Sequence, residues 1–325
     1  MRLTDYITPG KISQMQNGAE LFLQRWNDLF HRGLQELLTD ATPLLDMAEQ
    51  QVDCGNGNIA RQIRLVHREL SAESDPYWME RISQCLISAQ ALVRLDHFTV
   101  LQQLDILVQC GLRQQKKTLS PHGSKRSSWL VLHHATQTVE NLIQTTTYFQ
   151  SLENQSFGLD LQYRHLREKP KGPRRQVGQI IDLESVFYPS AHPLRLHVIQ
   201  EFSARRGAGH SGFASWDQWQ KYNITRIRTA PWLTHRPAIL QQLIATQDRG
   251  QPALRDTKST SALYLASETD ALTFWAFSEG LPIDIFGIGH SGHFEVHTLI
   301  RQDTYLPLSR PLLLRNVSNH SLDQN

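Results

Sequence analysis

The sequence has few cysteines and no long apolar run. Its three cysteines, Cys54, Cys85 and Cys110, are odd in number and widely spaced, which argues against a disulfide framework and suits a reducing compartment. No apolar stretch approaches the roughly 20 residues of a membrane-spanning helix. The first residues, MRLTDYITPG, lack the apolar core of a signal peptide. We therefore expect a cytoplasmic protein with no membrane partner.

An excess of charge of one sign is also absent. The chain holds 33 Lys and Arg against 31 Asp and Glu, a formal net charge of +2, so the molecule as a whole is not an obvious polyanion binder. Apolar residues make up 40% and charged residues 20% of its 325 residues. Such a chain folds as an ordered globular protein and has room for two domains or three small ones.

The glycine-framed motif of serine hydrolases is missing. The tetrad GHSG occurs at 209–212 and 289–292, but Phe213 and His293 hold the fifth position, where the hydrolase turn G-x-S-x-G needs glycine. Both tetrads are predicted to be flexible turns. We expect no enzyme activity and assign no catalytic residue.

A glycine loop with the spacing that binds phosphate is missing too. CGNGN (54–58) precedes a helix pattern, yet it lacks the G-x-G-x-x-G spacing and follows no strand. A loop between helices is the favoured interpretation. Arg61 and Arg64 lie nearby and leave an anion site open as the alternative.

Three histidines near the C-terminus, His290, His293 and His297, raise the question of a metal. In an extended chain His293, Glu295 and His297 share one face. The sequence shows no carboxylate in a supporting position, and residues 287–292 are predicted to form a hairpin turn. We therefore predict the polar outer face of an edge hairpin, with no metal and no cofactor.

The first third of the chain has helical periodicity. Apolar residues recur at helix spacing in the segments 22–37, 59–70, 78–93 and 101–108. Four such helices with polar outer faces and short links predict a small helical bundle over residues 1–122.

From about Ser127 the periodicity becomes that of strands. In FGLDLQYRH (157–165) apolar and polar residues alternate, which predicts a strand with one buried face. Further strands are predicted at 129–137, 143–149, 178–188 and 194–202. Together they predict an antiparallel β domain over residues 123–204.

The remainder is predicted to be mixed. Residues 205–252 are expected to hold a flexible linker, RRGAGHSG, and a helical segment that contains APWLTHRPAILQQL (230–243). Strand patterns in ALYLA, PIDIFG, FEVHTLI and TYLPL predict a C-terminal β module with a polar tail over residues 253–325. The fold class is therefore α+β: an N-terminal helical bundle followed by antiparallel β modules with a short helical insert.

The stretch ESVFYPSAHPLRLHV (184–198) is predicted to be a rigid corner between two strands. Pro189 has no amide proton for strand pairing, and Pro193 favours extended geometry in the residue before it. We expect Phe187 and Leu194 on either side of the corner to be buried. Because no acid accompanies the serine and histidine of the corner, they are not assigned as nucleophile and base.

Two loops, residues 113–126 and 164–175, are basic. If they converge in space, they form a patch that can contact phosphates, although no aromatic residues are interleaved with the charges. Nucleic-acid binding is therefore the alternative function. Its candidate residues are Lys116, Lys117, Lys125, Arg126, Arg167, Lys169, Lys171, Arg174 and Arg175.

The sequence FYPSAHPLR resembles a signature in the long C-terminal region of bacterial SWIM zinc-finger proteins. Further segments are similar to that family in the same order and cover most of residues 20–308. They are RWNDLFHRGLQEL (25–37), CGNGNIARQIRLVHREL (54–70), LISAQALVRLDHF (86–98), APWLTHRPAILQQL (230–243) and FSEGLPIDIFGIG (277–289).

The chain departs from this family at the finger itself. The SWIM finger supplies zinc ligands from C-x-C followed by C-x-H, and neither pattern occurs here. The chain thus resembles the body of the family without its finger, so zinc is not carried over. The resemblance implies as partners a finger-bearing SWIM protein, a MoxR-type AAA ATPase or a von Willebrand-A protein. We expect a non-catalytic adaptor or scaffold in a bacterial protein assembly.

Overall fold

The computed structural model forms two compact units. It describes residues 2–33, 37, 39–71, 78–116, 119, 123–139, 141–168, 175–207, 209–257, 262–265, 268–290 and 293–315. Unit 1 comprises Met1–Leu119, Pro189–His192 and Ile227–Leu233. Unit 2 comprises Ser120–Tyr188, Pro193–Arg226 and Thr234–Asn325. Helices come first and antiparallel sheets follow, so the predicted α+β class is confirmed.

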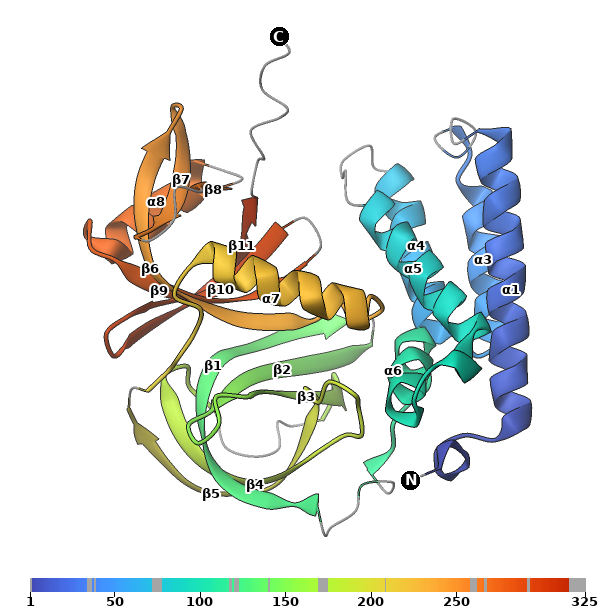
Figure 1. Cartoon of the computed structure of the whole chain (residues 1–325), viewed down its shortest axis with the longest axis horizontal. Helices are drawn as coiled ribbons and strands as arrows, with labels where there is room; N and C mark the ends of the chain where they lie inside the picture. The colour runs from blue at the N-terminus through green and yellow to red at the C-terminus, as the bar shows by residue number, and fades with distance from the viewer. Residues whose placement is uncertain are drawn as a thin grey trace. The chain divides into compact units, whose positions relative to one another are not determined.

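Unit 1 is the helical part, drawn in blue to blue-green in Figure 1. Its elements are η1 (Leu3–Asp5), α1 (Pro9–Arg32), α3 (Thr42–Asp53), α4 (Gly57–Ser71), α5 (Trp78–Val93), η2 (Leu95–His97) and α6 (Val100–Cys110). The sequence analysis missed α3, whose buried face consists only of Leu44, Met47, Ala48 and Gln51. No helix in the described part of the chain is long and apolar enough to cross a lipid bilayer.

The CGNGN loop is fixed to the backbone of α1. Asn56 Nδ2 donates to Met15 O (2.9 Å) and to Gln51 Oε1 (2.9 Å), and Gln51 Nε2 donates to Gly18 O (2.8 Å). Both amide side chains are fully buried, where a lost hydrogen bond is costly. The loop therefore joins helices in the core of unit 1, as the favoured interpretation requires.

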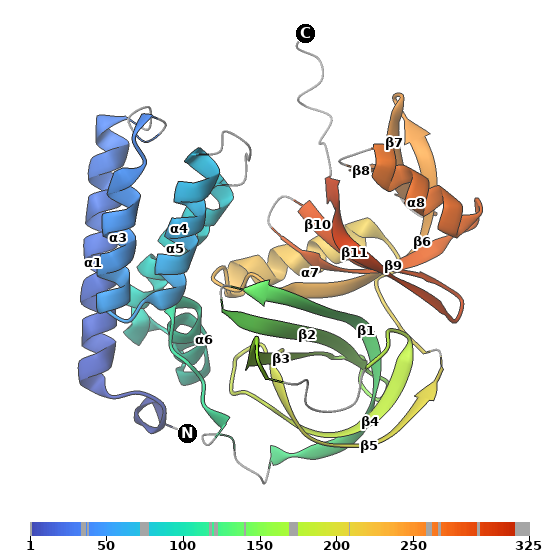
Figure 2. The same ribbon diagram turned by 180° about the vertical axis from the view of Figure 1, so that it is seen from behind.

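The first part of unit 2 is a curved five-stranded sheet (Figure 1, Figure 2). Its strands are β1 (Lys125–Val139), β2 (Leu142–Ser151), β3 (Phe157–His165), β4 (Gln179–Phe187) and β5 (Leu196–Arg206). They are ordered β3-β2-β1-β4-β5, and every neighbouring pair is antiparallel. The strands predicted over 123–204 all form.

The proline-flanked corner joins β4 to β5 as predicted. Tyr188 N donates to Arg195 O (2.9 Å), which closes the hairpin. Ser190 Oγ accepts from His192 N (2.9 Å), so this hydroxyl stabilises the turn. Phe187 and Leu194 are only partly buried, contrary to prediction, because they lie at or next to the ends of the strands that the corner joins.

The second part of unit 2 is a closed barrel, drawn in orange to red in Figure 1 apart from its first strand. Its strands are β6 (Arg236–Asp248), β7 (Gln251–Asp256), β8 (Ala262–Leu265), β9 (Ile283–Gly289), β10 (His293–Arg301) and β11 (Thr304–Arg315). They close in the order β10-β11-β8-β7-β6-β9. Two helices accompany them, α7 (Trp216–Thr229) and α8 (Glu268–Ser278). The domain boundary predicted at residue 252 is thus wrong, since β6 and β7 belong to the barrel.

The helix predicted over 230–243 is also wrong. The helix of this region, α7, ends at Thr229, and β6 begins at Arg236. Pro237 in the interior of a helix would remove a hydrogen bond and clash with the preceding turn. In the strand, Ala238 and Leu240 point into the barrel core while Ile239 packs outside it.

The segment predicted to be a flexible linker is held on both sides. His210 Nε2 lies 2.7 Å from Asp284 Oδ2 on β9, and its Nδ1 lies 3.1 Å from Tyr305 Oη on β11. Ser211 N donates to Gln150 Oε1 on β2 (3.0 Å). The described part of this segment is therefore anchored to the sheet and to the barrel.

Two β-bulges face one another where the sheet meets the barrel. The register of β1 shifts between Val131 and His133, and that of β10 shifts between Val296 and Thr298. Thr298 Oγ1 donates to the carbonyl oxygen of Leu132, the extra residue of the first bulge (2.6 Å). Bulges redirect side chains and are frequent next to functional sites.

Gly287 gives a test of the barrel geometry. A Cβ atom there would lie 2.2 Å from Glu295 O and 2.4 Å from the Phe294 ring, so Gly287→Ala should destabilise the barrel by about 1–3 kcal/mol. Gly123→Ala is the control, because its added Cβ would meet Val186 at 3.6 Å. Thermal unfolding should show a lower midpoint for Gly287→Ala only, and equal midpoints would contradict the close approach of β9 and β10.

Candidate metal centre

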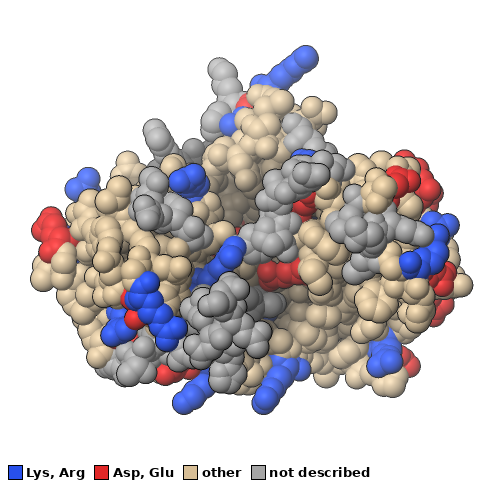
Figure 3. All heavy atoms as spheres, turned by 90° about the horizontal axis from the view of Figure 1, so that it is seen from above, with Lys and Arg blue, Asp and Glu red and all other residues tan. Residues whose placement is uncertain are grey.

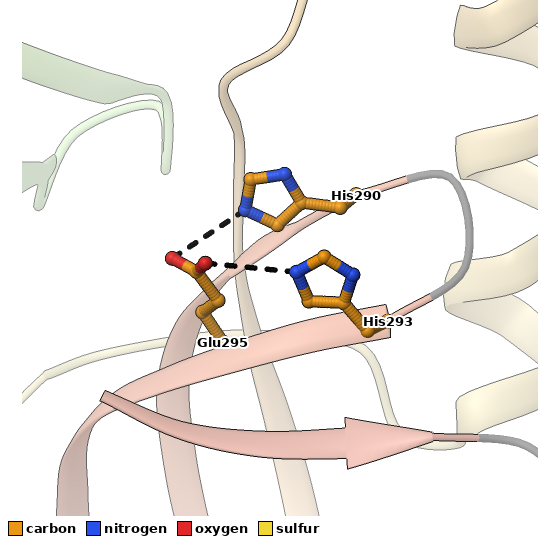
Figure 4. A group of neighbouring side chains, drawn as sticks. All are labelled: His290, His293 and Glu295. Carbon is orange, nitrogen blue, oxygen red and sulfur yellow. Dashed lines mark ion pairs between the residues drawn. The ribbon is translucent and has the colours of Figure 1, made fainter. Parts of the chain in front are cut away.

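The hairpin between β9 and β10 brings two imidazoles and a carboxylate together (Figure 4). His290 N donates to His293 O (2.8 Å), which closes the hairpin. The two imidazole rings stack with centroids 4.4 Å apart and an interplanar angle of 9°. Along β10, Phe294 points into the barrel core, so His293 and Glu295 lie on the outer face.

The distances within this group fit ligands around a shared cation, with the two imidazole nitrogens paired to different oxygens of the carboxylate. Glu295 Oε2 lies 3.5 Å from His290 Nε2, and Glu295 Oε1 lies 3.6 Å from His293 Nε2. Both are longer than the roughly 2.7–3.2 Å of a hydrogen bond. Ligands about 2.0–2.1 Å from a tetrahedral zinc ion lie roughly 3.4 Å from one another. One potential ligand atom from each of His290, His293 and Glu295 lies within 4.8 Å of the other two.

Glu295 is held in its charged form. Burial by itself would raise the pKa of Glu295, but the imidazoles of His290, His293 and His297 outweigh burial and hold that pKa well below its usual range. Metal ligands must be deprotonated to bind. His290 Nε2 is buried and lies 3.5 Å from Glu295 Oε2, at the long limit for a hydrogen bond. The group therefore offers a charged carboxylate, from Glu295, and a buried imidazole nitrogen, His290 Nε2, as metal ligands.

His297 and His133 lie next to this group. His297 Nε2 is 3.7 Å from Glu295 Oε2, and the His297 ring is 4.6 Å from the ring of His133 on β1. Burial, with the nearby His297 and His134, lowers the pKa of His133 to about 3. His133 is thus neutral, and its buried Nδ1 has no hydrogen-bond partner among the described residues. His133 and His297 pack against each other on the buried side of the carboxylate.

The donor set suits a transition metal. Imidazole nitrogen with carboxylate oxygen binds zinc and other first-row divalent ions, whereas magnesium and calcium prefer oxygen alone. The side chains of His290 and Glu295 are 25% and 30% exposed, whereas that of His293 is 9% exposed. A metal ion held here therefore faces solvent on one side.

The sequence predicted part of this arrangement. His293, Glu295 and His297 do share one face of a strand, but that strand is not at an edge, because β10 pairs with both β9 and β11. The prediction of a plain polar face assumed an edge strand, so that assumption is wrong. The expectation of no metal rested on the same assumption. Sequence reasoning missed His133, for which the signal was a histidine inside the apolar strand WLVLHHATQ.

Five of the nine basic residues predicted to bind nucleic acid lie among the described residues. Lys116, Lys125, Arg126 and Arg167 are exposed; Lys117, Lys169, Lys171 and Arg174 lie outside the described residues. On the face drawn in Figure 3, Lys and Arg stand singly or in small groups, several beside acids.

Arg175 was wrongly assigned to the basic surface. Its side chain is only 7% exposed, and its Nη1 lies 2.7 Å from Asp160 Oδ2. It also pairs with Glu201, and its guanidinium lies 5.1 Å from the centroid of the Phe149 ring. The guanidinium of Arg175 is thus paired with two carboxylates within unit 2, so Arg175 is a structural residue.

Comparison with known proteins gives no match. No protein-family model matches the chain, and no curated protein or solved structure matches it either. The resemblance to SWIM zinc-finger proteins therefore stays a prediction from the sequence.

The buried ion pair of Arg175 should contribute far more to stability than an exposed one. Arg175→Ala leaves Asp160 buried without its cation, which should cost roughly 3–5 kcal/mol. Lys125→Ala is the control, because it removes an exposed pair with Glu153 (2.6 Å) and should cost about 0–1 kcal/mol. Urea unfolding measures both, and similar losses would contradict the structural role of Arg175.

His133 should make folding stability depend on pH. The unfolded chain protonates this histidine below its ordinary pKa of about 6.5, whereas the folded chain keeps it neutral down to about 3. Stability contributed above the ordinary pKa is thus lost as pH falls toward 3. The groups that face His133 are His297, His134 and Tyr148, and the substitution of His133 described next leaves all three residues unchanged.

The measurement is the thermal midpoint between pH 7 and pH 5, with a chelator present. His133→Leu should flatten the decline seen in the unsubstituted chain. His97→Leu, which removes a histidine that is 71% exposed, should leave the decline unchanged. A decline of the same slope in all three chains would refute a neutral His133.

Proposed function

We propose that this chain is a metal-binding protein in which His290, His293 and Glu295 hold one divalent transition-metal ion. The observation that supports this most strongly is the spacing of the imidazole nitrogens from the Glu295 carboxylate, 3.5 and 3.6 Å. A carboxylate that simply accepted hydrogen bonds from these rings would lie closer to them. A shared cation accounts for the distances and for the parallel rings.

The electrostatics of the group favour this role. Glu295 keeps its negative charge, and the pKa of the neighbouring His133 is about 3, so that ring adds no positive charge against a cation. Two of the ligands, His293 and Glu295, come from β10 of the closed barrel, whose paired strands hold side chains more precisely than a loop does. Among the first-row ions, zinc is the expected occupant because it has no geometric preference of its own and readily accepts nitrogen and oxygen ligands.

The adaptor role predicted from the sequence is compatible with a metal centre and stays a separate prediction. The same holds for its suggested partners and for the nucleic-acid alternative. A metal ion that joins the end of β9 to the start of β10 would stabilise the barrel rim, because a ligand that binds only the folded chain shifts the folding equilibrium by mass action.

Zinc titration of the tag-free chain, after dialysis against a chelator, tests the proposal. We expect one zinc ion per chain by elemental analysis and a raised thermal midpoint. His293→Ala and Glu295→Gln should each weaken binding at least tenfold, because each removes a ligand.

The matched control is His165→Ala, which removes an exposed histidine at the end of β3 and should bind zinc like the unsubstituted chain. Circular dichroism checks that each variant is folded. The proposal fails if the folded chain retains no zinc or if His293→Ala retains it unchanged.

A further inference from the structure

The number of ligands leaves one coordination position of the metal to be filled from outside the group. Zinc in proteins takes four ligands, and sites with three protein ligands keep one position for water or substrate. The set that lies within 4.8 Å contains three residues, His290, His293 and Glu295. This inference rests on the metal-binding function proposed above.

His297, which approaches the same carboxylate oxygen as His290, is a candidate for a fourth protein ligand. Its Nε2 approaches Glu295 Oε2 at 3.7 Å, and it lies outside the three-residue set. Its ring packs against His133 at 4.6 Å and lies 6.5 Å from the ring of Phe286. The β10 bulge, which Thr298 Oγ1 fixes to Leu132 O, holds the backbone of His297 in this position. His297 therefore lies beside the ligand set without belonging to it.

The exposure of the side chains shows which side of the metal is open. His290 and Glu295 are 25% and 30% exposed, whereas His297 is 14% exposed and His133 is buried. An outside ligand thus approaches past His290 and Glu295, and the histidine pair closes the opposite side.

The charge of the centre selects the kind of ligand. A divalent ion carries two positive charges, and Glu295 is the one acid in its ligand set, which leaves one positive charge (2 − 1). The imidazole ligands are neutral when they bind a metal. In a half-buried site such a charge attracts an anion strongly.

We infer that the metal ion binds an exogenous oxyanion, a carboxylate or a phosphate group, at this open position. The oxygen atom coordinates the metal directly and neutralises the remaining charge. The natural ligand is then a small molecule, or an exposed group of a partner, that carries one of these two anions.

Cobalt is the probe for this inference, because its visible absorption reports the number and type of its ligands. The chain is loaded with Co²⁺, and inorganic phosphate or acetate is added in separate titrations, with chloride as the ionic control. We expect a saturable change of the cobalt spectrum with phosphate or acetate but not with chloride. Which of the two acts at lower concentration distinguishes a phosphate ligand from a carboxylate ligand.

The variant His297→Ala separates the open site from a closed one. If His297 is not a ligand, this variant should respond to the anions as the unsubstituted chain does. The opposite result is that the unsubstituted chain does not respond to either anion and the His297→Ala variant does. That result would show that His297 fills the position, and it would overturn this inference while leaving the proposed metal binding intact. If Co²⁺ does not bind at all, the proposed function fails and the inference fails with it.

Discussion

The hydrogen bond from Thr298 Oγ1 to Leu132 O connects the barrel to the five-stranded sheet at the point on which the site depends. Both residues are fully buried, so the bond is shielded from water and expensive to lose. Because each partner lies at a bulge, the bond also fixes which side chains face one another across the contact. It sets His133 against His297, and His297 in turn stands beside the carboxylate of Glu295.

Local sequence patterns were sufficient for elements with an unambiguous period. The strand over 157–165 has the predicted ends because its apolar and polar residues alternate throughout. The region around Leu240 was misassigned because its clustered apolar residues fit a helix face as well as a strand, and Pro237 was the signal against a helix. The closure of the barrel depends on pairing between strands far apart in the chain, which no local period encodes.

The candidate site divides in the same way. The two-residue spacing of His293, Glu295 and His297 is enough by itself to place them on one face of a strand. The position of that face, inside a barrel and against His133, follows only from tertiary packing. Arg175 illustrates the converse, since its basic neighbours in sequence suggested a surface while Asp160 and Glu201 bury it. A charged residue is assigned safely only when its partner is known.

The anchored segment around His210 has a consequence for how unit 2 behaves as a whole. One imidazole bonds to β9 and β11, and the next residue bonds to β2, so neither the sheet nor the barrel can separate without breaking the same few contacts. Local opening of one part then exposes buried polar groups of the other, which makes partial unfolding unfavourable. The sheet and the barrel should accordingly exchange their amide hydrogens as one cooperative unit. Local unfolding at the barrel rim should therefore also raise amide exchange in β1 and β2.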